Sequence, residues 1–178
     1  AGVMHVARII ATLKEFTHPG TESKSPTDLN LLIENAMVIT HNELKHVAEV
    51  ETSFDAGLPF LNCEPGSISQ VLLNLIINAA DAIKERENTN GLGKITISTR
   101  QVEQNVELRL SDNGVGIVKD VRDRIFDPFF TTKEVGKGSG QGLAIAYDIL
   151  VNKHQGNIVC ESTPGQGTTM IIKFPLDE

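Results

Sequence analysis

The sequence SISQVLLNLIINAADAIKE, residues 67–85, decides how this chain folds. At roughly 100° per residue its apolar side chains surround most of a helix, which is typical of a helix packed on several sides. Its polar residues recur at intervals of three and four, so they stack in one narrow stripe. The polar stripe consists of Ser67, Gln70, Asn74, Asn78, Asp81 and Glu85. Polar groups on such a helix need polar partners, so the stripe is either a solvated edge or part of a binding site.

Composition sets the limits for the rest of the chain. With 178 residues and 40% hydrophobic content, the chain can form one sizeable core, as expected of a single domain with an additional arm. The net charge of −7 argues against nucleic acid as a partner. No stretch approaches the roughly 20 apolar residues of a membrane span, and no signal peptide is visible. We therefore expect a cytoplasmic domain without a membrane segment, even if its parent protein is membrane-bound. Cys63 and Cys160 lack a C-x-x-C arrangement and are expected to be packed thiols.

The N-terminal part is expected to lie outside the main domain. Residues 3–18 repeat apolar side chains at helical spacing and stop at Pro19 and Gly20. Residues 21–26 are polar and typical of a linker. We therefore assign residues 1–20 to a separate helix that needs a partner, and residues 27–178 to the main domain. The absence of an initiator Met suggests a fragment.

The order of the elements in the main domain indicates the fold class. Helix signals at residues 26–28 precede a predicted helix over residues 29–44, and Pro65 opens the striped helix without losing a hydrogen bond. Residues 119–125 and 142–154 are also predicted to be helical. Alternating patterns predict strands at 47–54, 94–100, 105–111, 156–161 and 168–174, the second and third forming a hairpin. This order predicts an α/β fold, a two-layer α/β sandwich with one mixed sheet covered by helices.

Two glycine motifs follow the striped helix in the sequence. Asp112, Gly114 and Gly116 follow a predicted strand, where glycines let the backbone approach a ligand and a carboxylate can accept from an amine. Gly136, Gly138, Gly140 and Gly142 precede a helix, so their amides could hold a polyphosphate. Alone, the first motif also fits an ordinary turn and the second a flexible loop. The second motif matches neither a P-loop nor a dinucleotide fingerprint.

Taken together and in this order, the asparagine stripe, the first glycine motif, a phenylalanine-rich box and the second glycine motif resemble the ATP-binding catalytic domain of sensor histidine kinases. That domain belongs to the superfamily that includes gyrase, MutL-type repair proteins and heat-shock chaperones. The resemblance covers residues 26–175 and implies a Bergerat-type ATP-binding fold. Residues 3–18 resemble the second helix of that family's dimerisation hairpin.

The resemblance also implies the site residues. Asn78 would be the Mg²⁺ ligand, and Asn74, one turn earlier, the second catalytic position beside the phosphates of ATP. Asp81 would support them. Asp112 would accept from the adenine amino group. The other residues implied for cofactor binding are Gly114, Gly116, Ile117, Lys133, Lys137, Gly138, Gly140, Gly142, Leu143 and Thr168.

The phenylalanine box, formed by Phe126, Phe129 and Phe130, is expected to anchor a mobile lid by packing and to perform no chemistry. The second glycine motif departs from the family pattern, because Gln141 stands where a Leu is usual. This departure bears on the packing of the lid.

One substitution bears on the reaction. The resemblance implies a Glu in the relatives that hydrolyse ATP. It would lie four residues before the Asn that binds the metal, where it can activate water. Here that position holds Asn74, which cannot accept a proton at neutral pH. Phosphoryl transfer needs mainly positioning and charge neutralisation, so the sequence favours a kinase. The alternatives are an ATP-hydrolysing relative and a non-enzymatic nucleotide-sensing module.

The phosphoacceptor histidine is expected upstream of this chain. His41 and His46 superficially resemble an acceptor box, but they follow the hairpin remnant and lie inside the catalytic-domain match. The other histidines are expected to be solvated or packed. By resemblance, the partners are the receiver domain of a response regulator and a second copy of the parent protein, joined through the dimerisation hairpin.

Overall fold

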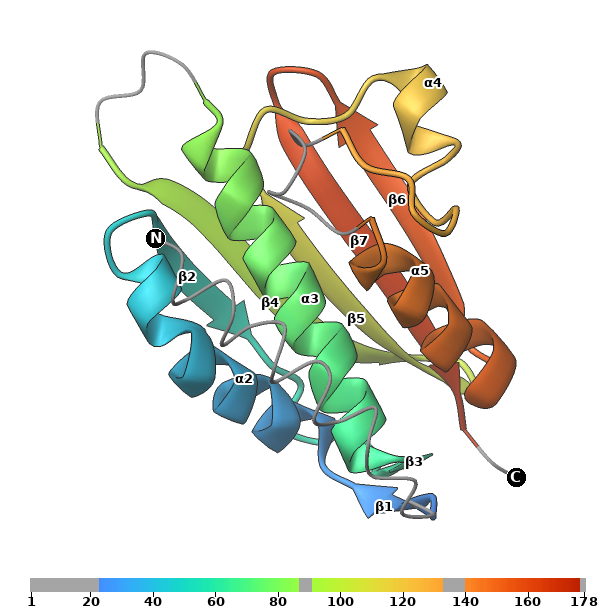
Figure 1. The fold of residues 1–178 in the computed structure, drawn as a ribbon. Helices are drawn as coiled ribbons and strands as arrows, with labels where there is room; N and C mark the ends of the chain where they lie inside the picture. The colour runs from blue at the N-terminus through green and yellow to red at the C-terminus, as the bar shows by residue number, and fades with distance from the viewer. Residues whose placement is uncertain (1–22, 87–90, 133–139, 177–178) are drawn as a thin grey trace.

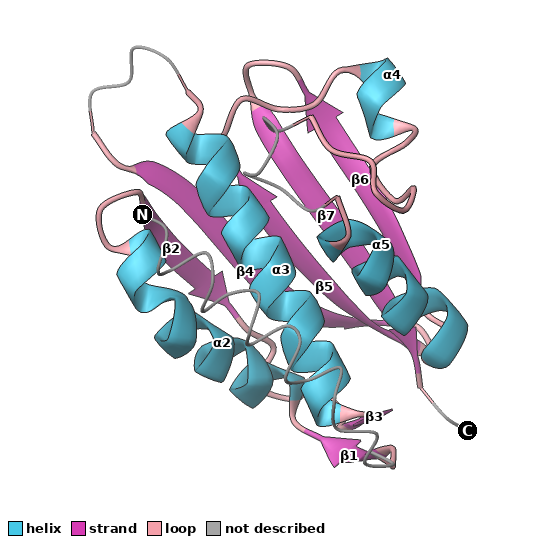
Figure 2. Ribbon diagram, viewed as in Figure 1, coloured by secondary structure: helices cyan, strands magenta, loops and turns pink. Residues whose placement is uncertain are grey.

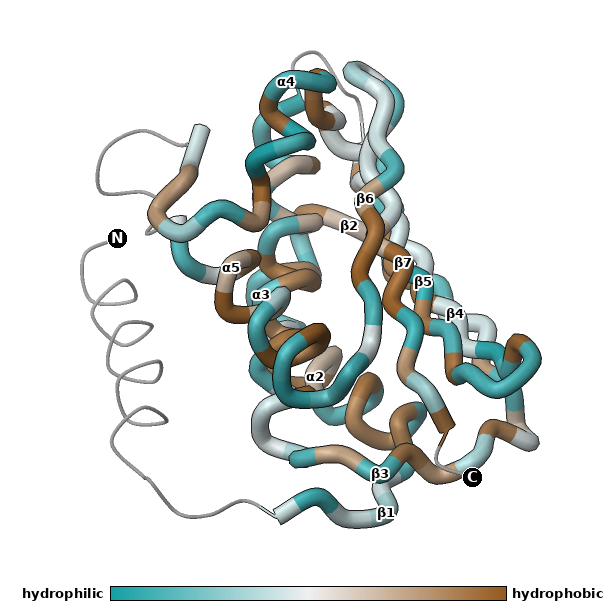
Figure 3. Tube along the Cα trace, turned by 90° about the vertical axis from the view of Figure 1, so that its right-hand side faces the viewer, coloured by the Kyte–Doolittle hydropathy of each residue, from teal (hydrophilic) through white to brown (hydrophobic). Residues whose placement is uncertain are grey.

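The computed structural model describes residues 23–86, 91–132 and 140–176. The helix predicted over residues 3–18 lies outside these ranges. Within them, helices α2, α3 and α5 lie in front of one large sheet (Figures 1 and 2). The side view in Figure 3 shows helices on one side and strands on the other. The predicted two-layer α/β sandwich is therefore confirmed.

The large sheet has five strands in the order β2-β4-β5-β7-β6. β2 pairs with β4 in parallel, and the other neighbours pair antiparallel, so the sheet is mixed as predicted. β4 and β5 form the expected hairpin, with Glu103 at φ 54° in its tight turn. The strands are β2 Ala48–Ser53, β4 Gly93–Val102, β5 Asn105–Asp112, β6 Asn157–Thr163 and β7 Gly167–Pro175.

Helix α3 (Pro65–Lys84) is the centre of the core. Eight of its residues are buried, because it packs against α2, α5 and the sheet. By length and hydropathy, α3 alone among the described helices could cross a membrane. Such a stretch was not predicted from the sequence. Its apolar side chains are instead buried among those of the sheet and the neighbouring helices, as in the core helix of a folded domain.

The flanking helices follow the sequence signals. Helix α2 (Leu29–Leu44) begins at the cap residue Asp28, whose Oδ1 accepts from the N–H of Leu31 at 3.2 Å. Helix α4 (Lys119–Arg122) is shorter than predicted. Helix α5 (Gly142–Tyr147) was predicted to continue unbroken, but Asp148–Lys153 form a π-helix, η1. In this wider turn the consecutive residues Ile149 and Leu150 are both buried.

A small second sheet was not predicted. β1 (Ser25–Thr27) pairs antiparallel with β3 (Leu61–Cys63). Ser25 and Pro26 were assigned to the linker, but they pair with Cys63 and Asn62 in this sheet, shortly before α3. Three-residue strands have no periodicity, so only their pairing reveals them.

His154 is packed, one of the two alternatives expected for the histidines. Its ring is 6% exposed. Its Nε2 accepts from the N–H of Glu64 at 3.0 Å, so Nδ1 carries the proton and donates to the carbonyl of Ile149 at 2.7 Å. The ring thereby connects the end of η1 to the residue that precedes α3.

The face of the sheet opposite the helices carries a charge cluster around one buried carboxylate. The side chain of Glu107, on β5, is only 3% exposed and contacts Arg100 and Arg109 at 2.6 and 2.8 Å and Lys173 at 3.8 Å. Burial by itself raises the pKa of Glu107. The hydrogen bonds and charges of Arg109 and Arg100 outweigh this effect and hold the pKa below its usual range.

We predict that Glu107→Gln lowers the free energy of unfolding at neutral pH by about 1–3 kcal/mol, the range for hydrogen bonds to a charged group. A carboxylate with a lowered folded-state pKa stabilises above the unfolded-state pKa of about 4.3. That contribution disappears as the pH falls through the folded-state value. The difference between variant and wild type, measured by urea unfolding, should therefore narrow towards about pH 3.

The control is Glu103→Gln, which removes an exposed carboxylate from the turn of the same hairpin. It should change stability little at any pH. A difference for Glu107→Gln that stays constant with pH would contradict the assignment.

Candidate functional site

The polar stripe of α3 faces the start of α5. The stripe residues are half-buried, apart from Glu85 at the exposed end. The side chain of Asn74 donates from Nδ2 to the carbonyl oxygen of Gly142 at 3.2 Å. Sixty-eight residues separate these partners in the chain. The asparagine stripe and the end of the second glycine motif are therefore adjacent, as the sequence analysis required.

The first glycine motif packs against the same helix. The N–H of Val115 donates to the carbonyl of Ala82, in the last turn of α3, at 3.1 Å. A Cβ at position 114 would lie 2.7 Å from the carbonyl carbon and the Cβ of Ala82. Only glycine permits this approach, because real Cβ contacts are longer. Gly114 thus serves the contact between turn and helix.

The turn between β6 and β7 holds the other side of this motif. Gly116 has φ +70°, and a Cβ there would collide with the carbonyl oxygen of Thr163. The N–H of Gly165 donates to the carbonyl of Val115 at 2.7 Å. The motif is therefore clamped between α3 and the β6–β7 turn, and its glycines are needed at both contacts.

Ser162 is a residue of this site that sequence reasoning missed. Its Oγ accepts from the N–H of Ile117 at 2.8 Å, lies 2.9 Å from Thr168 Oγ1, and lies 2.9 Å from the carbonyl oxygen of Gly167. It connects the first glycine motif to β7. A serine in an alternating strand gives no sequence signal for such a role. Ala82 was missed because its contacts with Val115 and Gly114 involve its backbone and its Cβ, and an alanine in an apolar helix gives no sequence signal for them.

Asp112 lies at the end of β5, opposite Thr168 on β7. Burial raises the pKa of Asp112 above its usual range, although hydrogen bonds from the backbone of Gly114 and Thr168 oppose the shift. The bond from Gly114 N–H to Asp112 Oδ1 is 2.8 Å long and fixes one carboxylate oxygen. A fixed, partly desolvated carboxylate is suited to selective hydrogen bonding.

The phenylalanine box contacts the second glycine motif. Gly140 has φ +64°, and a Cβ there would lie 2.5 Å from the carbonyl carbon of Phe129. The guanidinium of Arg124 lies 4.4 Å from the ring centroid of Phe130. The ring of Phe126 lies 5.5 Å from that of Tyr147. These are packing contacts, as expected for two of the rings, whereas Phe129 is 73% exposed and has φ +64°.

The other predicted site residues have varied positions. Asn78 is half-buried on α3, and Asp81 contacts Lys84 at 3.6 Å. Leu143 packs against the core, and Thr168 is buried. Lys133, Lys137 and Gly138 lie outside the described residues, so their predicted contacts to phosphate stay predictions.

The described ranges contain no metal-ligand cluster and no reactive cysteine. They contain no group of three His, Cys, Asp or Glu side chains arranged for a metal ion. Cys63 and Cys160 are both free, as expected. Burial raises the pKa of both thiols, that of Cys160 to about 11, so neither is a reactive thiolate.

Comparisons with known proteins agree with this geometry. Residues 63–178 match the family described as "Histidine kinase-, DNA gyrase B-, and HSP90-like ATPase". The chain is 35% identical over 174 residues to the signal transduction histidine-protein kinase AtoS of Escherichia coli (strain K12), covering 97% of this chain and 27% of AtoS. It is 33% identical over 172 residues to the sensor histidine kinase ZraS of the same strain, covering 96% of this chain and 35% of ZraS. The chain thus spans about a third or less of these relatives.

Solved structures give the same result. The catalytic domain of histidine kinase ThkA has a TM-score of 0.72 at 29% identity, covering 85% of this chain and 95% of that domain. A structure of ThkA in complex with response regulator protein TrrA has a TM-score of 0.72 at 26% identity, covering 98% of this chain and 49% of that one. These matches confirm the fold inferred from the sequence.

We predict that Gly114→Ala destabilises the domain by about 1–3 kcal/mol, the usual cost of overpacking. The added methyl group would meet the backbone of Ala82, which cannot move without disturbing α3. Chemical unfolding measures the effect. Gly57→Ala is the matched control, because its Cβ would meet only the side chain of Asp55, at 3.5 Å. Equal stability of the two variants would show that the turn does not need this close contact.

Proposed function

This chain belongs to the family of histidine kinase-, DNA gyrase B- and HSP90-like ATPases, and it is the ATP-binding domain that this family shares. From that premise we propose that it uses ATP with Mg²⁺ to phosphorylate a histidine. The histidine would lie elsewhere in the parent protein, and the phosphoryl group would pass on to a response regulator. The proposal concerns the whole protein, because the matched relatives are about three to four times as long as this chain.

One observation carries the proposal. A single helix, α3, contacts both glycine motifs, through Asn74 to Gly142 and through Ala82 to Gly114. Asn78 lies between these two contact points, one helical turn from each along the rod. A nucleotide whose phosphates lie at Asn78 and whose base lies at Asp112 would therefore bridge the two motifs.

The residues present fit Mg²⁺ that is shared with the nucleotide. Mg²⁺ keeps several waters and is bound by few protein oxygens together with substrate phosphates. The carboxamide oxygen of the half-buried Asn78 is such a ligand. A bound Mg²⁺ would neutralise charge on the phosphates during transfer. Asn78 would orient the phosphates through it, and Asp81 would support this part of the stripe.

The base would be recognised by Asp112. The carboxylate accepts from the backbone of Gly114 and Thr168, and its two oxygens have further lone pairs that would accept from the adenine amino group. Gly116 and Ile117 would shape the base pocket beside it. Thr168, buried and held by Ser162, supports Asp112 from the neighbouring strand.

The structure adds a reason to prefer a kinase to a hydrolase. Asn74 cannot act as a general base, and its amide nitrogen is already bonded to the carbonyl of Gly142. A Glu at this position would place a carboxylate against that carbonyl oxygen and break the contact. Water is therefore not activated from this position, and the phosphoryl group is kept for another nucleophile.

The proposed partners follow from the relatives. ThkA has been crystallised in complex with the response regulator protein TrrA, which supports a receiver domain as the acceptor of the phosphoryl group. Residues 1–20 would be the end of a hairpin that dimerises the parent protein and carries the histidine upstream. This domain would work in the cytoplasm, where ATP is available.

We predict that Asn78→Ala abolishes the Mg²⁺-dependent part of ATP binding, a loss of about tenfold or more in affinity. Calorimetric titration of ATP with Mg²⁺, and with a chelator in its place, measures this part. Asn35→Ala, on the exposed side of α2, is the control and should leave both affinities unchanged. A Mg²⁺-dependent gain that survives in Asn78→Ala would contradict the metal role.

The kinase activity is tested by supplying a separate dimerisation hairpin that carries the histidine. We predict that this chain, mixed with ATP, Mg²⁺ and a separate dimerisation hairpin of its parent protein, labels a hairpin histidine with an acid-labile phosphoryl group. Phosphate release without the hairpin should be slow. Brisk hydrolysis by the chain alone would favour the hydrolase. Tight ATP binding without labelling would favour a nucleotide-sensing module.

A further inference from the structure

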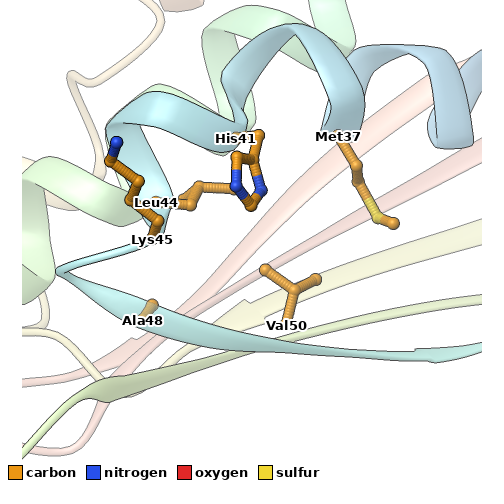
Figure 4. Close-up of a pocket in the computed structure, with 6 residues that line it drawn as sticks. All are labelled: Met37, His41, Leu44, Lys45, Ala48 and Val50. Carbon is orange, nitrogen blue, oxygen red and sulfur yellow. The ribbon is translucent and has the colours of Figure 1, made fainter.

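A cavity of about 240 Å³ lies away from the proposed nucleotide site. It opens between the C-terminal half of α2 and strand β2 (Figure 4). Helix α2 lies above it and the strand below it. Its lining residues are Met37, His41, Leu44, Lys45, Ala48 and Val50. None of these residues has a role in the function proposed above.

The lining is apolar inside and basic at the rim. Met37 and Val50 point toward each other across the gap (Figure 4). Leu44 and Ala48 are buried, whereas His41 and Lys45 are exposed. An apolar pocket with polar groups at its rim is typical of a binding site for a side chain.

Strand β2 is an edge strand. In the described part of the chain it pairs only with β4, and its other side has no partner strand. The carbonyl of Val47 accepts from the N–H of Gly93 at 2.7 Å, and the N–H of Asp55 donates to the carbonyl of Thr99 at 3.2 Å, so both ends of the strand bond to β4 through odd-numbered residues. In a parallel pair these groups alternate along the strand. The N–H and C=O groups of Ala48, Val50 and Thr52 therefore point away from the sheet.

The cavity and the open edge of β2 involve the same residues. Ala48 and Val50 present their side chains to the cavity and their backbone groups to the open edge. A strand added at this edge would place every second side chain on the helix side of the sheet, under α2. Main-chain bonds would supply affinity and the cavity would supply specificity, as in recognition by strand addition.

We propose that the edge of β2 binds an extended peptide segment of a partner protein as a sixth strand of the sheet. One apolar side chain of the segment occupies the cavity between Met37 and Val50. An acidic side chain two residues away lies near Lys45. The exposed Lys45 supplies a positive charge at the rim of the cavity. On the opposite face of the sheet, the positive charge of Lys94 is already paired with Glu51 at 2.7 Å. The helix side of the edge therefore favours acidic segments.

The test uses the full chain and a capped peptide, acetyl-Thr-Glu-Thr-Val-Thr-Val-amide. Its alternate residues place one Glu and two Val side chains on a single face. The matched peptide has Lys in place of Glu. The first peptide should shift the backbone NMR signals of Ala48, Val50 and Thr52, and the Lys peptide should bind about tenfold more weakly.

Two variants at position 52 isolate the backbone contribution. Thr52→Pro removes an outward N–H, which an edge strand tolerates, and should weaken peptide binding about fivefold, as expected for one lost hydrogen bond. Thr52→Ala keeps the N–H and should bind as wild type. ATP binding should be unchanged in both variants. Equal peptide affinity of the two variants would overturn strand addition.

A variant at another position covers the case in which Thr52→Pro does not fold. Ala48→Leu fills the cavity without changing the backbone edge, and should weaken binding of the Val-containing peptide. Unchanged affinity of Ala48→Leu, or NMR shifts confined to other elements, would overturn the proposal. So would sedimentation of the wild type as a dimer that Ala48→Leu dissociates, because a second copy would then cover the edge.

Discussion

The arrangement of the candidate site depends on how closely the backbone of other segments can approach helix α3. Gly114 lies against the backbone of Ala82, and Gly142 receives the amide of Asn74. At Gly114 a Cβ would lie 2.7 Å from the backbone of Ala82, so this turn can approach the helix only because a Cβ is absent. These contacts bring together segments that are far apart in the sequence. The candidate site is therefore a consequence of the packing of one helix.

The character of α3 explains why one element can do this. Eight of its 20 residues are buried, and the helix packs against the sheet on one side and against α2 and α5 on others. Its stripe is the one polar line along this rod. Side chains on a rigid, buried helix are positioned more precisely than those on a loop. The asparagines are consequently suited to orient phosphates.

The two proposed sites lie on different parts of the domain. The proposed nucleotide site involves α3, the start of α5 and the C-terminal end of β5, whereas the cavity under α2 lies at the β2 edge of the sheet. One site is built from glycine contacts and polar side chains, and the other from an apolar pocket and an unpaired strand. A partner at the β2 edge would leave the nucleotide site open.

The sequence by itself determined the layered fold, the hairpin, the central helix and the identity of the motifs. These features depend on local periodicity and on the order of the elements along the chain, and both can be read from the residues. It could not determine the sheet between β1 and β3, the π-helix at Asp148–Lys153 or the role of Ser162. Only the tertiary structure decided these features, because each depends on partners distant in sequence or on packing against the core. Asn74 can be recognised as an unusual residue from the sequence, but its bond to Gly142 cannot, because that bond joins residues 68 positions apart.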